Sequence, residues 1–93
     1  MTPSRYVMKT DPSYVVEAVQ LHESDTNWAE VADWCGGDVH MDGSPATGIF
    51  SVLVVGNDSG VHGDWIVKQS GGWFVWDADG FAHVFHLVTE AAR

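Results

Sequence analysis

The chain has 93 residues, of which 45% are hydrophobic and 12% aromatic, and its formal net charge is −9. This size supports one small core without room for a second domain, and so apolar a composition excludes an intrinsically disordered chain. Four Lys and Arg stand against 13 Asp and Glu, which argues against binding to nucleic acid or to an anionic membrane surface, because both attract cationic side chains. A protein partner with a basic surface is compatible with this charge.

The sequence favours a cytoplasmic location. Its single cysteine, Cys35, excludes an intramolecular disulfide and fits a reducing compartment. Residues 1–14 lack the apolar stretch of a signal peptide. The longest strongly apolar stretch, residues 49–55, is far shorter than the about 20 residues that span a bilayer.

The N-terminal residues divide into an expected arm and a first strand. Pro3 and Pro12 each remove a backbone donor and push the preceding residue into extended geometry, so we expect residues 1–13 to form a flexible arm. Residues 14–93 then form the single domain. Residues 14–21 are rich in β-branched side chains and predict its first strand.

A short helix is expected next. Four residues follow the spacing of one helical stripe: Trp28, Val31, Ala32 and Cys35. Asn27 can cap the start of this helix, with Glu30 three residues further on as in a capping box. Gly36 and Gly37 can end it, because glycine adopts positive φ at little cost. The apolar stripe must be buried on a sheet, since so short a helix is not stable alone.

Strands dominate the second half. Residues 38–48 contain Gly, Asp and Pro and predict a loop, after which four strands are expected at residues 49–55, 64–69, 73–76 and 83–88. Ser70, Gly71 and Gly72 predict a three-residue hairpin connection between the second and third of these strands. The fold class is therefore α+β, a single small domain with one short helix on an antiparallel sheet of four or five strands that could curl.

Residues that could carry chemistry are few. Cys35 at the end of the helix is expected to be a buried structural thiol. His83 and His86 are three apart in an expected strand, which places them on opposite faces and prevents them from sharing a metal ion. A zinc site that uses His40 or His62 stays open. Asp77 and Asp79 begin like a calcium loop, but Phe81 occupies the third ligand position, so an Asp-rich turn is favoured.

The sequence also lacks the Gly-x-Ser-x-Gly and phosphate-binding glycine motifs, so we expect no enzyme, metal or cofactor. The five tryptophans are the most informative residues for function. The run from Trp73 to Trp76 directs large rings to both faces of a strand. If one face is exposed, Trp73, Trp76, Asp77 and Asp79 form a patch that binds a basic protein surface. The alternative is a core that covers both faces.

Three ordered segments carry a resemblance to a known family: residues 17–20 (EAVQ), 34–37 (WCGG) and 63–68 (GDWIVK), followed by a late Phe81. They resemble the small acidic proteins of unassigned activity that are encoded by tailed bacteriophages and prophages. This resemblance implies an accessory protein in the cytoplasm of an infected bacterium. The Ala-, Val-, Asp- and Gly-rich composition favours a phage of a GC-rich host such as an actinobacterium.

We therefore expect a non-catalytic protein that binds a bacterial host protein during infection, for host takeover, inhibition or superinfection exclusion. Two alternatives stay open. The chain could be an acidic mimic of DNA that blocks a nucleic-acid-binding host protein, or a homo-oligomeric structural component of the phage.

Overall fold

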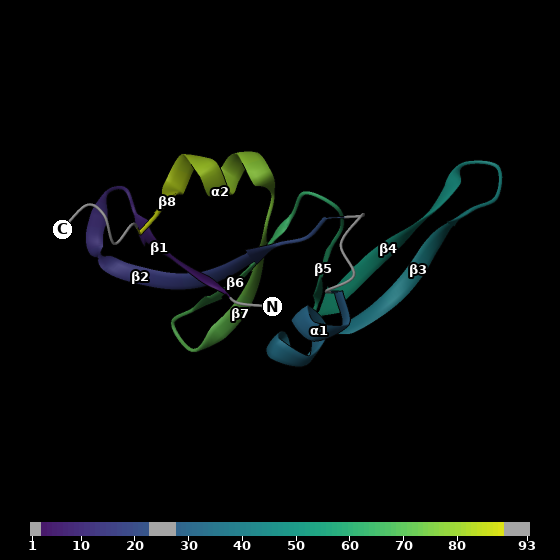
Figure 1. Ribbon diagram of the computed structural model, residues 1–93, viewed down its shortest axis with the longest axis horizontal. Coiled ribbons are helices and arrows are strands. Elements are labelled where there is room, and N and C mark those ends of the chain that lie inside the picture. Colours follow the sequence, from purple (N-terminus) through teal and green to yellow (C-terminus); the bar gives the residue numbers. More distant parts are fainter. Residues whose placement is uncertain (1–2, 23–27, 89–93) are drawn as a thin grey trace.

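The computed structural model describes residues 3–22 and 28–88, which form an α+β fold, as the sequence predicts. This described part contains two helices and eight strands, and the strands form two antiparallel sheets. In chain order the elements are β1 (Ser4–Met8), β2 (Asp11–Gln20), α1 (Trp28–Cys35), β3 (Asp38–Ser44), β4 (Gly48–Val55), β5 (Asp58–Gly60), β6 (Trp65–Gln69), β7 (Gly72–Trp76), α2 (Ala78–Val84) and β8 (Phe85–Leu87). The molecule is elongated, 49 × 23 × 21 Å, because the β3–β4 hairpin extends away from the other elements (Figure 1).

The larger sheet has the order β7-β6-β2-β1-β8 and has a hydrophobic cluster on each face, while the smaller sheet has the order β3-β4-β5. Ile66 and Val67 are neighbours in β6, so their side chains point to opposite faces. Ile66 packs in a cluster with α1 and with Leu53 of β4, whereas Val67 packs beneath Phe81 of α2. Two hydrophobic clusters, one on each face of the larger sheet, therefore hold the fold together.

The expected N-terminal arm is instead a strand inside the larger sheet, so this prediction is wrong for the described residues. β1 pairs with β2 on one side and with β8 on the other. Val7 is buried, and the ring of Tyr6 packs edge-on against Trp65 and Phe81 at centroid distances of 5.2 and 5.0 Å. Pro12 is tolerated because the pairing register shifts at this end of β2, where a missing backbone donor costs little.

Helix α1 confirms the predicted stripe. Its buried residues are Trp28, Val31, Ala32 and Cys35. Gly36 ends the helix at φ 71°, and the N–H of Gly37 donates to the carbonyl of Ala32 at 2.9 Å. The proposed cap, Asn27, lies outside the described residues.

Helix α2 was not expected, and the predicted strand at residues 83–88 is wrong over its first part. Asp77 caps the helix by accepting the N–H of Gly80 at 2.5 Å. Phe81 anchors it by packing against the sheet with 2% of its surface exposed. His83 therefore belongs to α2, and β8 begins only at Phe85. A single capping carboxylate and one buried ring thus define a helix that has a glycine in its first turn.

The predicted hairpin between β6 and β7 is confirmed, with a loop one residue shorter than expected. Ser70 and Gly71 have φ values of 50° and 77°, and Gln69 pairs with Gly72. Two consecutive positive φ angles are typical of the type I′ turn, whose twist matches that of the strands it joins. Gly72 is therefore the first residue of β7 rather than part of the turn.

Residues 38–48, expected to be a loop, contain strand β3. The register runs from Asp38 opposite Val54 to Ser44 opposite Gly48. The turn-forming residues are confined to the end of this segment, and residues 38–42 alternate polar and apolar side chains, which suits a strand. The structure thus has a long hairpin where we expected a connection.

Candidate protein-binding surface

The structure does not bring the four predicted binding residues together on one surface. Trp73 and Trp76 are three apart in β7 and lie on opposite faces of the sheet. Trp73 packs edge-on against Trp34 at a centroid distance of 4.6 Å, with the Lys68 ammonium 5.7 Å from its ring. Trp76 packs against Phe85 on the other face.

Both tryptophans are half-buried and belong to the two hydrophobic clusters. The indole N–H of Trp76 donates to Oε1 of Gln69 at 2.9 Å, so its polar atom already has an intramolecular partner. The arrangement is the covered core that the sequence left open as the alternative to a tryptophan patch.

Asp77 and Asp79 lie beside Trp76 at the start of α2. The carboxylate of Asp77 accepts the N–H of Gly80, which satisfies one of the unpaired donors of the first turn. Asp79 is exposed in that same turn, where negative charge interacts favourably with the helix dipole. The turn-forming role predicted for this segment takes the form of a helix cap.

The residues considered for catalysis and metal binding are dispersed. Burial raises the pKa of the Cys35 thiol above its ordinary value, an effect partly offset by backbone hydrogen bonds from Gly37 and from Cys35 itself. The rings of His22 and His62 meet edge-on at 5.9 Å. No group of three His, Cys, Asp or Glu side chains across residues 3–22 and 28–88 is placed to hold a metal ion. Neither helix of these segments has the length and apolar character to cross a bilayer.

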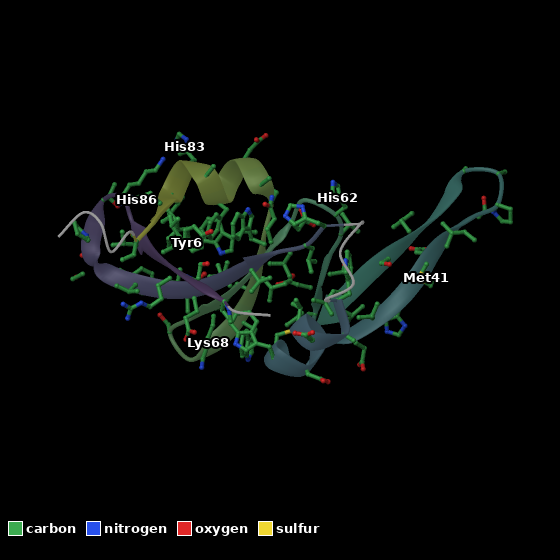
Figure 2. All side chains as sticks on the ribbon, in the orientation of Figure 1. Tyr6, Met41, His62, Lys68, His83 and His86 are labelled. Atoms are coloured by element: carbon green, nitrogen blue, oxygen red, sulfur yellow. The ribbon has the colours of Figure 1, made fainter. Side chains whose placement is uncertain are left out.

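The β3–β4 hairpin presents the most exposed apolar surface. Val39 lies opposite Leu53, which is fully buried, and Met41 and Ile49 continue the same face outward along the hairpin. Their exposed fractions rise from 39% at Val39 to 64% at Met41 and 57% at Ile49. Phe50, on the opposite face, is 40% exposed. Figure 2 shows the Met41 side chain on the projecting hairpin, away from both helices.

This hairpin surface is a continuation of the core beyond the body of the protein. Its apolar residues begin at the buried cluster around α1 and extend to where no other described element covers them. We define the hairpin surface as Val39, Met41 and Ile49 on one face of the hairpin, together with Phe50 on the opposite face. The chain matches no family model, no curated protein and no solved structure. The assignment of this surface therefore depends on the geometry and charge of the chain itself.

The Lys, Arg, Asp and Glu residues in the chain segment that contains the hairpin are all negative. Residues 28–63 contain no Lys or Arg, and their carboxylates are Glu30, Asp33, Asp38, Asp42 and Asp58. The cationic residues of the described segments, Arg5, Lys9 and Lys68, belong to the region of β1, β2 and β6. The hairpin therefore combines exposed apolar side chains with an uncompensated negative field, which favours a partner that is both apolar and basic.

Strand β3 was not predicted, because the Gly, Asp and Pro residues of the segment 38–48 favoured a loop over the alternating pattern of residues 38–42. Asp38, His40 and Asp42 alternate with Val39 and Met41, which is the two-residue period of a half-buried strand. The apolar residues at 49–55, directly downstream, needed an antiparallel neighbour. Together these two signals could have identified β3.

Proposed function

We propose that the protein is a non-catalytic binding protein that docks its β3–β4 hairpin on another protein. The supporting observation is the concentration of exposed apolar residues: the hairpin carries four of the eight large hydrophobic side chains that are exposed within the described segments. Three of them, Val39, Met41 and Ile49, share one face, and apolar residues that remain exposed side by side are characteristic of protein-interaction sites. The surrounding carboxylates favour a partner with a basic surface.

The biological setting of this proposal comes from the sequence resemblance to small phage proteins. It makes a protein of the infected bacterium the expected partner, bound in the host cytoplasm for takeover, inhibition or exclusion of a second phage. The predicted tryptophan patch contributes less to this proposal than the hairpin, because Trp73 and Trp76 lie on opposite faces and pack in the core.

The proposal is tested by affinity purification of the tagged chain from an actinobacterial lysate, followed by binding measurements with the purified captured protein. The test variant is Met41→Ser with Ile49→Ser, which removes two neighbouring side chains from one face of the hairpin. The matched control is Val15→Ser with Phe74→Ser, which removes two side chains of similar exposure, 49% and 44%, from the larger sheet.

We expect the control to bind like the wild type and the hairpin variant to bind at least about tenfold more weakly, because central apolar contacts dominate interface energies. Equal binding by the hairpin variant would reject the hairpin as the docking surface. Recovery of the chain alone, with a concentration-independent oligomer in sedimentation, would replace the proposal by a homo-oligomeric phage component.

A further inference from the structure

Strand β3 has one long edge that no described strand covers. It is the terminal strand in the order β3-β4-β5, and every residue from Asp38 to Gly43 is exposed. An uncovered edge presents a row of backbone donors and acceptors that can pair with another extended chain. The edge of β3 is therefore a possible template for an added strand.

The hydrogen-bond alternation identifies which residues direct their backbone outward. Val55 and Asp58 flank a two-residue turn, so the backbone N–H and C=O groups of Val55 bond to β5. Because successive residues of a strand direct these groups to opposite sides, the backbone groups of Val54 bond to β3. The position of the Val54 carbonyl oxygen agrees with this direction, because it lies so close to Gly37, the residue before β3, that a Cβ atom added to Gly37 would be 2.6 Å from it. Because the pattern alternates, the backbone groups of Val39 and Met41 point away from β4.

The next outward donor is already occupied. The N–H of Gly43 donates to the side-chain Oδ1 of Asp42 at 2.7 Å. The accessible template is thus the segment Asp38–Asp42, with Val39 and Met41 supplying the outward donors and acceptors.

The side chains of this segment are sorted by face. Val39 and Met41 lie on the apolar face that continues from the core, whereas Asp38, His40 and Asp42 lie on the other. A strand added beside β3 would place its alternate residues next to these two rows. Apolar residues would meet Val39 and Met41, and cationic residues would meet Asp38 and Asp42.

Building on the proposed function, we propose that the partner contributes an extended segment of alternating apolar and Lys or Arg residues, which adds to the β3 edge as a fourth strand. Main-chain hydrogen bonds would supply affinity, and the two side-chain rows would supply specificity. A second copy of the chain fits less well, because residues 28–63 carry five carboxylates without a Lys or Arg, and two such hairpins would repel each other.

The test uses a fluorescent peptide of alternating valine and lysine residues as the probe. Its control is the same peptide with N-methylated valines, which keeps the charge but cannot form the ladder. On the protein, Met41→Pro removes the outward N–H of β3, and Met41→Ser removes the side chain while keeping that N–H. Amide hydrogen exchange of the wild-type protein, with and without peptide, provides a readout that needs no variant.

We expect the peptide to bind Met41→Ser at least about tenfold more tightly than Met41→Pro, and to slow exchange at the amides of Val39 and Met41. Equal binding of the N-methylated peptide, or unchanged exchange at these two amides, would reject strand addition. That result would leave the proposed function standing if the captured host protein still requires Met41 and Ile49. Host-protein binding that ignores both side chains would instead reject the proposed function itself.

Discussion

Asp77 shows how much one side chain contributes to the fold. Its carboxylate accepts the N–H of Gly80 and holds the start of a seven-residue helix. We predict that Asp77→Ala lowers the free energy of unfolding by about 1 kcal/mol, because the first turn loses its side-chain acceptor. Urea denaturation measures the change. Asp79→Ala is the control, since this exposed carboxylate interacts only with the dipole, and its loss should cost about 0.3–0.5 kcal/mol. Equal losses would show that Asp77 does not act as a cap.

The buried thiol of Cys35 makes the free energy of unfolding depend on pH. Burial raises the pKa of its thiol from the ordinary 9.0, so the unfolded chain releases this proton at a lower pH than the folded protein. We predict that the free energy of unfolding is independent of this group below pH 9.0 and falls as the pH rises through that value, because ionisation favours the unfolded chain. Urea midpoints across this range measure it. In Cys35→Ala the free energy of unfolding should no longer fall with pH through the thiol. The part of the fall that comes from Tyr6, whose pKa is raised from 10.0 by burial, should remain. Identical slopes would contradict the assignment.

At the scale of elements, the outer part of the hairpin, residues 41–51, projects beyond the core, whereas Leu53 and Val55 at its base belong to it. Met41, Ile49 and Phe50 keep 40–64% of their surface exposed. We predict that replacing residues 41–51 by Asn-Gly, a type I′ turn between the paired residues His40 and Val52, changes the free energy of unfolding by no more than about 1 kcal/mol. Thermal and urea unfolding measure this. A loss of several kcal/mol would show that the hairpin stabilises the body.

The same division between core and surface explains which elements the sequence revealed. The stripe from Trp28 to Cys35 and the strands β4, β6 and β7 contribute apolar residues to the two hydrophobic clusters, so local sequence patterns predicted them. β1 was missed because Pro3 and Pro12 suggested an arm, whereas its pairing with β2 and β8 is a long-range property. Helix α2 depends on one cap and on Phe81, and no short-range pattern distinguishes it from a turn. The separation of Trp73 from Trp76 followed from strand alternation, but whether both faces were covered required the tertiary structure.

At the scale of the whole molecule, the charged residues are unevenly distributed between the two halves of the structure. The formal net charge is −9, and the segment from residue 28 to residue 63 holds five carboxylates without Lys or Arg. Arg5 and Lys68, by contrast, are the register partners of Glu17 on its two sides in β1, β2 and β6, where opposite charges on neighbouring strands attract each other. Repulsion within the acidic half opposes folding, and dissolved salt screens it with a Debye length of about 10 Å at 0.1 M.

We therefore predict that the thermal midpoint of the free protein rises by about 2–5 °C between low salt and 0.3 M sodium chloride, where this repulsion is largely screened. Differential scanning calorimetry measures the shift. Asp38→Asn with Asp42→Asn reduces the net charge from −9 to −7 and should raise the midpoint at low salt while weakening its dependence on salt. A midpoint that falls with salt in the wild type would mean that attraction between opposite charges on neighbouring strands, such as Arg5 and Glu17, outweighs the repulsion. The hairpin carboxylates would then not destabilise the free protein, and a basic partner would gain no affinity from neutralising their repulsion.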